Sequence, residues 1–189
     1  MPDLKPTTPE ALLSEVERFI ADEVVPLEVQ EGGNLHHASE EFRRSLQAAA
    51  RARGLLAPHV SKEFGGHGLG LVERAPVFEA AGYSLFGPLA INIAAPDEGN
   101  MHLLEMVATE EQKQVYLVPL AAGEIRSAFA MTEPAPGAGS DPSMLRTSAV
   151  PVNGGWRIDG HKWFITGATG ASFFICMART GDSGSAATM

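Results

Sequence analysis

The chain has 189 residues, of which 44% are hydrophobic and 20% charged, so it can build an apolar core. Its net charge of -9 argues against a nucleic-acid partner, which requires clustered Lys and Arg. The single cysteine, Cys176, excludes an internal disulfide, and the six histidines lack zinc-ligand spacing, so no metal site is expected. Because the N-terminus has no secretion signal and no apolar run approaches about 18 residues, we expect a cytoplasmic protein without a membrane span.

Apolar residues in the first two thirds of the chain recur at the three- and four-residue spacing of helices. A first helix is expected after Thr8 as N-cap, with Pro9 at its first position. A second is expected after Ser39 as N-cap, and Gly54 ends it. The glycine-rich run 65–70 has no strand before it and the wrong spacing for a dinucleotide-binding loop, so we interpret it as a connection.

Further helices are expected at Leu71–Tyr83 and Met101–Val107. Thr109 and Gln112 then form a capping box, in which each side chain satisfies a free backbone donor of the other residue. The helix that this box opens is expected to carry the apolar residues 115–117 toward a core.

After Gly123 the apolar pattern changes from helical to alternating, which is typical of strands. The strands expected here are Ala128–Met131, Thr147–Val152, Trp156–Ile158, Lys162–Thr166 and Ser172–Arg179. Residues 153–155 (Asn-Gly-Gly) predict a hairpin, because asparagine and glycine tolerate positive φ.

This order of elements predicts an α+β fold, in which helices are followed by an antiparallel meander. We expect an N-terminal all-α domain, residues 1–125, followed by an incomplete antiparallel β-barrel domain, residues 126–189. Four or five strands seldom close a barrel, and we therefore interpret the chain as interrupted.

The first segment of chemical interest comprises residues 129–141. It begins with Phe-Ala-Met-Thr-Glu-Pro at 129–134 and ends with Gly-Ala-Gly-Ser-Asp at 137–141. Such a glycine-rich turn after a strand can bring backbone N–H groups close to a phosphate. It is neither a Walker loop nor a nucleophile elbow. The alternative is a tight connection between two strands.

The second segment comprises residues 160–167, Gly-His-Lys-Trp-Phe-Ile-Thr-Gly. In a strand Trp163 and Phe164 would point to opposite faces, whereas Phe164 and Thr166 would share one. The latter pair could stack on a flat ring and donate a hydrogen bond to its edge. Taken alone, the pattern is also ordinary strand composition.

Together and in this order, the two segments resemble the acyl-CoA dehydrogenase family. The first is similar to its Thr-Glu-Pro…Gly-Ser-Asp signature and the second to its Gly-x-Lys-x-Trp-Ile-Thr signature. Gly-Leu-Leu-Ala-Pro at 54–58 with Glu-Phe-Gly-Gly at 63–66 resembles the family's first-domain loop. Glu-Glu-Gln-Lys at 110–113 with Tyr-Leu-Val-Pro-Leu at 116–120 resembles the helix that leads into its barrel.

The resemblance implies a flavin enzyme that binds FAD and oxidises acyl-CoA thioesters to trans-2-enoyl-CoA. It also implies an electron-transferring flavoprotein as electron acceptor and a homodimer or homotetramer as the assembly. In the family a C-terminal helical bundle follows the barrel, and this sequence does not contain it.

The resemblance assigns roles to five residues of the first segment. Backbone groups of Phe129 and Met131 and the hydroxyl of Thr132 should meet the pyrimidine side of the flavin. Gly139 and Ser140 should bind the pyrophosphate of FAD, and Ser140 should also lie near the thioester arm of the substrate.

In the second segment, Phe164 occupies the position at which the family usually has a tryptophan packed against the flavin. Thr166 should hydrogen-bond the flavin near its reactive N5 edge. The turn 135–138 is two residues longer than the commonest form of the family, which leaves the pyrophosphate contacts open.

The catalytic base of the family is a glutamate, which usually lies in the C-terminal bundle. No glutamate of this chain aligns with it, so no catalytic residue is assigned, and the chain alone is expected to be inactive. Glu133 is expected to hold the flavin loop. The alternatives are a non-catalytic FAD- or acyl-CoA-binding module, one subunit of a split dehydrogenase, and an α+β interaction domain without flavin. The continuation of the reading frame would discriminate among them.

Overall fold

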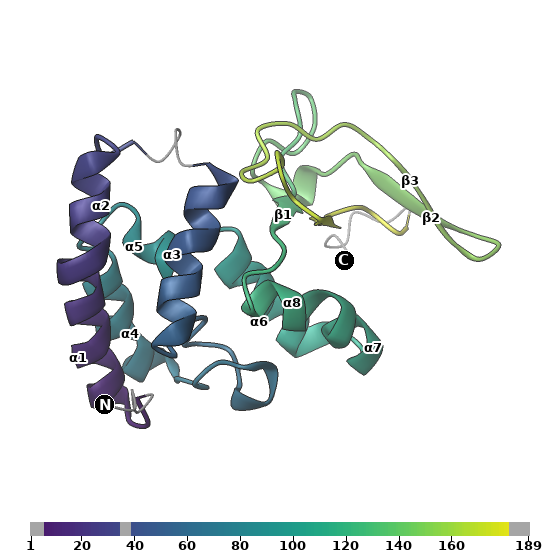
Figure 1. Cartoon of the computed structure of the whole chain (residues 1–189). Coiled ribbons are helices and arrows are strands. Elements are labelled where there is room, and N and C mark those ends of the chain that lie inside the picture. Colours follow the sequence, from purple (N-terminus) through teal and green to yellow (C-terminus); the bar gives the residue numbers. More distant parts are fainter. Residues whose placement is uncertain (1–5, 35–38, 182–189) are drawn as a thin grey trace. The chain divides into compact units, whose positions relative to one another are not determined.

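The computed structural model describes residues 6–34 and 39–181. The chain divides into two compact units, Met1–Ile125 and Arg126–Met189, whose positions relative to one another are not determined (Figure 1). The first unit is helical and the second contains the strands. The α+β class is therefore confirmed.

The first unit begins with a long helix formed by α1 (Pro9–Phe19), a π-helical turn η1 (Ile20–Val24) and α2 (Val25–Gln30). The Thr8 hydroxyl accepts a hydrogen bond from the backbone N–H of Ala11, which confirms the predicted N-cap. The side chains on one face of this helix are fully buried: Leu12, Val16, Phe19, Ile20 and Val24.

Helix α3 (Glu40–Ala52) also begins after a hydroxyl-bearing N-cap residue. The Ser39 hydroxyl accepts from the backbone N–H of Phe42 at 3.0 Å, which confirms the second predicted cap. Gly54 lies just beyond the helix end with φ +72°, a conformation that glycine adopts at little cost. The glycine-rich run 65–70 is a connection, as expected, and it follows directly after the short helix η3 (Lys62–Phe64).

In the described part of this unit six further elements follow: α4 (Leu71–Ala81), α5 (Gly87–Ala90), α6 (Asp97–Val107), α7 (Glu110–Gln112), the π-helical turn η4 (Lys113–Leu117) and α8 (Val118–Ala121). The capping box of Thr109 and Gln112 is confirmed. Leu117 is buried, but Val115 and Tyr116 are exposed, so the prediction that all three face a core is wrong. Consecutive residues of a helix point in different directions, so three in a row cannot share its buried face.

Buried side chains satisfy the carbonyl groups at the C-terminal end of α8. The Asn92 side-chain amide donates to the carbonyl oxygens of Leu120 (2.8 Å) and Ala121 (3.2 Å). The Arg43 guanidinium donates to the carbonyl of Gly123 at 3.2 Å. These bonds fix the last helical turn before the chain enters the second unit.

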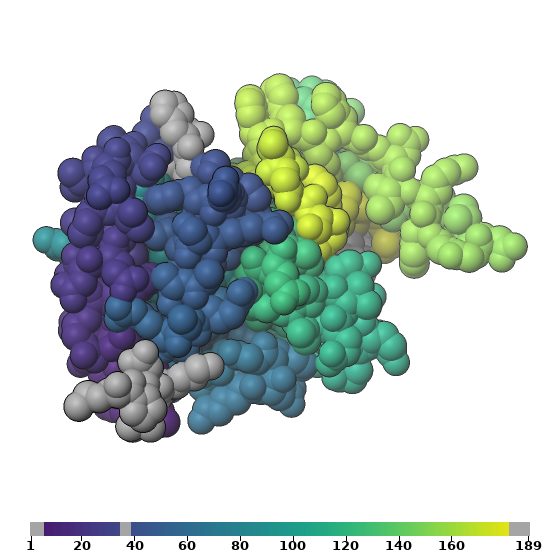
Figure 2. Space-filling model, viewed as in Figure 1, coloured from purple at the N-terminus to yellow at the C-terminus, as the bar shows by residue number. Residues whose placement is uncertain are grey.

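The second unit contains β1 (Ser127–Ala130), η5 (Pro142–Met144), β2 (Ser148–Val152), β3 (Gly155–Asp159) and β4 (Phe173–Cys176). Strands β2 and β3 form the predicted antiparallel hairpin, with Gly154 in its turn at φ +84°. Every residue of β3 is exposed, and the hairpin extends away from the rest of its unit (Figure 2).

The remaining pairing differs from the expected meander, because β1 and β4 are parallel, with Ser127 opposite Phe173. The strand predicted at Lys162–Thr166 is absent. Phe164 instead has φ +51°, and a turn closes between Ile165 and Ala168. Among the described residues, the strands form two separate pairs rather than a closed barrel. No described helix combines the length and apolarity needed to cross a membrane.

Candidate functional site

A buried carboxylate organises the second unit just after β1. Glu133 is only 3% exposed, and its carboxylate accepts four hydrogen bonds. One oxygen accepts from the backbone N–H groups of Ala138 (3.3 Å) and Arg146 (2.8 Å). The other accepts from the backbone N–H of Thr147 and the ammonium of Lys162, both at 2.9 Å. We call these five residues the Glu133 cluster.

The hydrogen bonds of the Glu133 cluster determine the charge of the carboxyl group. Burial by itself raises the pKa of Glu133, but hydrogen bonds from Thr147, Arg146 and Lys162 outweigh burial and lower this pKa to about 2. The group is therefore a carboxylate at neutral pH, with its charge compensated by an ammonium and backbone dipoles.

The two segments that the sequence predicted to act together meet at this cluster. Besides contacting Glu133, the Lys162 ammonium donates to the carbonyl of Met131 at 2.8 Å. The backbone N–H of Trp163 donates to the carbonyl of Thr132 at 3.1 Å. Residues 131–133 and 162–163 thus lie side by side. The prediction that Glu133 holds the loop agrees with these contacts.

The glycine-rich loop is closed at its base by a pair of backbone hydrogen bonds. Glu133 and Gly139 exchange N–H···O bonds of 3.2 Å in both directions, and Gly139 has φ +53°. A Cβ atom on Gly137 would lie 2.5 Å from the Glu133 carboxylate, so this position must stay without a side chain. Gly139 and Ser140 are both exposed at the end of the loop.

The aromatic pair of the second segment departs from the sequence prediction. The ring centroids of Trp163 and Phe164 are 4.6 Å apart with an interplanar angle of 35°, so the two rings lie together rather than on opposite faces. Phe164 is 81% exposed. Its left-handed backbone ends the alternation of an extended chain, so the predicted shared face of Phe164 and Thr166 is wrong.

The predicted site residues all lie in the second unit, but contacts join only some of them. Phe129 lies in β1 opposite Ile175, and it is half-buried, as are Met131 and Thr132. Thr166 is exposed in the turn that follows Phe164. The Glu133 cluster thus brings together the end of β1, the base of the glycine-rich loop and the start of the second segment.

Lys162 belongs to the Glu133 cluster, but sequence reasoning left it without a role. The signal that could have found it is complementary charge, because one segment contains a single lysine and the other contains a glutamate. Such charges are rarely buried unless they are paired.

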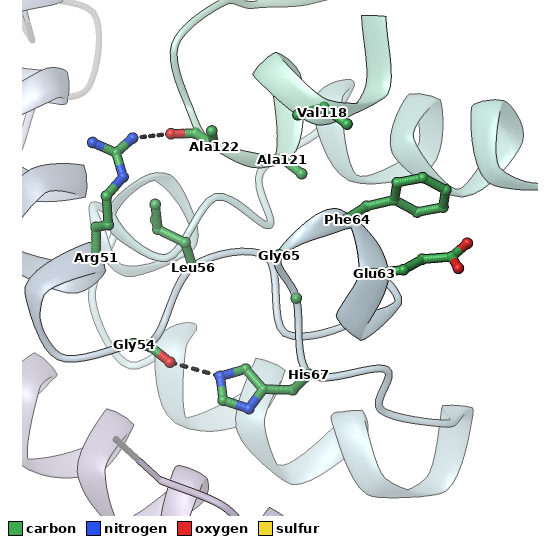
Figure 3. Close-up of a pocket in the computed structure, with 11 residues that line it drawn as sticks. Arg51, Gly54, Leu56, Glu63, Phe64, Gly65, His67, Val118, Ala121 and Ala122 are labelled. Atoms are coloured by element: carbon green, nitrogen blue, oxygen red, sulfur yellow. Dashed lines mark hydrogen bonds between the residues drawn. The ribbon is translucent and has the colours of Figure 1, made fainter. Parts of the chain in front are cut away.

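A separate cavity of about 490 Å³ lies within the first unit (Figure 3). A histidine and an arginine that line this cavity each contact a backbone carbonyl of the same unit. His67 Nε2 lies 2.6 Å from the carbonyl oxygen of Gly54, and the Arg51 guanidinium donates to the carbonyl of Ala122. The described residues contain no group of acidic, histidine and cysteine side chains able to hold a metal ion.

Comparisons with known proteins match both the helical unit and the β unit. Residues 7–124 match the family model of the acyl-CoA dehydrogenase N-terminal domain, and residues 128–189 match that of the middle domain. The chain belongs to the acyl-CoA dehydrogenase family.

Individual relatives agree with this assignment. The probable acyl-CoA dehydrogenase FadE2 of Mycobacterium tuberculosis is 39% identical over 157 residues, which is 82% of this chain and 38% of that protein. The (R)-benzylsuccinyl-CoA dehydrogenase of Thauera aromatica is 35% identical over 90% of this chain and 44% of its own length. The chain thus spans less than half the length of these two relatives.

Solved structures are similar as well. A probable acyl-CoA dehydrogenase from Mycobacterium abscessus has a TM-score of 0.71 and 32% identity, covering 93% of this chain and 46% of that one. An FAD complex of PigA has a TM-score of 0.73 and 26% identity, covering 97% of this chain and 46% of that one.

Proposed function

We propose that this chain supplies part of the flavin site of an FAD-dependent acyl-CoA dehydrogenase. The reaction is the oxidation of an acyl-CoA thioester to its trans-2-enoyl-CoA, with an electron-transferring flavoprotein as acceptor. The protein acts as a homodimer or homotetramer in the cytoplasm. The observation that carries the proposal is the Glu133 cluster, which joins the two signature segments.

The side chains and backbone of the second unit fit FAD in their chemistry. The Phe164 ring is 81% exposed and offers a flat apolar surface for a ring system. Gly139 has positive φ and no side chain, so its backbone can come close to a phosphate. The similar solved structure of PigA is an FAD complex, and this supports FAD as the cofactor of this chain.

In this proposal each segment binds one part of FAD. The backbone of Phe129 and Met131 and the hydroxyl of Thr132 bind the pyrimidine side. The exposed pair at 139–140 binds the pyrophosphate, and the Ser140 hydroxyl also contacts the thioester arm of the substrate. When bound, FAD accepts the hydride that leaves the substrate β-carbon.

Phe164 and Thr166 bind the other side of the ring system. Phe164 stacks on it, and the Thr166 hydroxyl donates to the N5 edge. Thr166 lies in a turn and not in a strand, so the face of a strand does not support its contact with the flavin. The family signature and the exposure of Thr166 support that contact.

The reaction also needs a carboxylate that removes the α-proton of the thioester. Glu133 is unsuitable, because it is buried, accepts four hydrogen bonds and has its pKa lowered to about 2. A general base works best with a pKa near the working pH. We therefore expect the 189-residue polypeptide alone to show no turnover in a dye-reduction assay with short, medium or long acyl-CoAs.

The proposal is tested by FAD titration of the full-length gene product, followed by its visible absorption. We expect a bound flavin spectrum and an affinity that falls about tenfold in Phe164→Ala, since an aromatic contact contributes about 0.5–1.5 kcal/mol beyond its buried area. Phe174→Ala, which removes an exposed aromatic of β4, is the matched control and should bind FAD like the wild type. A wild-type protein without a flavin spectrum at saturating FAD would refute the proposal. Binding without turnover would instead favour a non-catalytic module or a split subunit.

A further inference from the structure

The ion pair between Glu133 and Lys162 differs in burial from the others in the described part of the chain. The two side chains are 3% and 12% exposed, and the charged atoms are 2.9 Å apart. In seven other ion pairs of the described residues, one side chain is 27% or more exposed. A buried pair must overcome the desolvation of both charges and is weak evidence for added stability.

The contacts of the pair indicate what it does instead. Glu133 fixes the loop that carries Gly139 and Ser140, through the N–H of Ala138 and its own backbone exchange with Gly139. Lys162 fixes the carbonyl of Met131 and, through the neighbouring Trp163, the start of the aromatic segment. Both parts of the candidate flavin site therefore depend on one pair of charges.

We infer that Glu133 and Lys162 are positioning residues that also balance the charge beside the flavin, an inference that rests on the proposed function. The intact pair is neutral as a whole, so it imposes little net field on a nearby redox group. Replacing one partner leaves the other as an uncompensated buried charge, and the two single replacements leave charges of opposite sign.

The opposite signs distinguish this role from a purely structural one. Glu133→Gln leaves the Lys162 ammonium, and a positive charge favours the more negative, reduced flavin and raises its midpoint potential. Lys162→Met leaves the Glu133 carboxylate and lowers that potential. Loss of packing alone would weaken FAD binding in both variants, but it would not move the potential in opposite directions.

The experiment uses the full-length product with FAD as the probe, in the wild type, the two single variants and the Glu133→Gln/Lys162→Met double variant. We expect each single variant to bind FAD about tenfold more weakly, as for the loss of one hydrogen bond of about 1.4 kcal/mol. The midpoint potentials, measured by spectroelectrochemistry, should shift in opposite directions. The double variant should return toward the wild-type potential while its affinity stays low.

Two controls accompany these variants. Glu110→Gln and Lys113→Met break an ion pair of the same 2.9 Å length in the first unit, where Glu110 is exposed, and should change neither affinity nor potential. Lys162→Arg keeps the charge and should keep the wild-type potential. If Glu133→Gln does not fold, a lowered potential in Lys162→Met still supports the inference, and an unchanged or raised one overturns it.

The outcomes separate the two proposals. A wild-type protein that binds no FAD overturns the proposed function and this inference with it. A wild-type protein that binds FAD, with single variants equal to it in affinity and potential, overturns the inference alone. Potentials that shift in the same direction in both single variants also overturn it.

Discussion

Acid should destabilise the second unit through protonation of Glu133. The pKa of this group falls from 4.5 to about 2 on folding, because its hydrogen bonds outweigh its burial. A lowered folded-state pKa gives stability that is fully present above the unfolded value of 4.5 and is lost as the pH falls toward about 2. One pKa unit corresponds to about 1.4 kcal/mol, so the folded unit is about 3 kcal/mol more stable with Glu133 ionised than with Glu133 protonated.

The chain provides its own reporter for this measurement. Its two tryptophans, Trp156 and Trp163, both lie in the second unit, so tryptophan fluorescence follows the unfolding of that unit alone. Urea unfolding of the wild type should show a free energy that falls steeply below pH 4.5, whereas Glu133→Gln should start lower and depend less on pH. Asp159→Asn removes an exposed carboxylate from the same unit and should keep the wild-type slope.

The wild type and Glu133→Gln are compared by how steeply their unfolding free energies fall with pH. The other carboxylates contribute equally to both proteins, so a difference in slope comes from Glu133. If wild type and Glu133→Gln lose stability in parallel between neutral pH and about pH 2, the hydrogen-bonded carboxylate is not the source of the acid sensitivity. The magnitude worked out from its pKa would then be wrong.

Three further substitutions test individual contacts. Gly160→Ala places a Cβ 2.2 Å from the Thr147 hydroxyl and should destabilise the second unit by about 1–3 kcal/mol in tryptophan-monitored unfolding; Gly155→Ala meets no atom within 4 Å and should cost less. Asn92→Ala removes the amide that caps α8 and should lower the stability of the helical unit by about 1–3 kcal/mol in far-UV circular dichroism; an unchanged transition would exclude that role. Ser39→Ala should cost about 1 kcal/mol in the same assay, and no loss would mean that the hydroxyl does not stabilise α3.

Local interactions were predictable from the sequence. The caps at Thr8, Ser39 and Thr109 each involve a hydroxyl and an N–H three residues away, so a short stretch of sequence specifies them. The β2–β3 hairpin follows from its two-residue turn at 153–154 for the same reason.

Pairings between distant residues were not predictable. The second segment has the composition of a strand, but contacts with residues about thirty positions earlier hold it in another conformation. The parallel pairing of β1 with β4 likewise joins residues that are far apart in sequence. In the candidate site, the family signature identified both segments, while the role of Lys162 emerged only from its contacts. The FAD contacts assigned from the signature stay predictions.

The closure of the glycine-rich loop by Glu133 and Gly139 has a consequence for how this family can vary. Backbone hydrogen bonds between Glu133 and Gly139 close the loop at its base, so residues inserted at the exposed positions 135 and 136 change only the length of a closed segment. Doubling the length of a flexible loop costs only about 0.6 kcal/mol of closure entropy. The two additional residues that the family resemblance implies for this turn would therefore fit without displacing Glu133 or Gly139. The loop can therefore change in length, whereas the hydrogen bonds between Glu133 and Gly139 must stay for its base to remain closed.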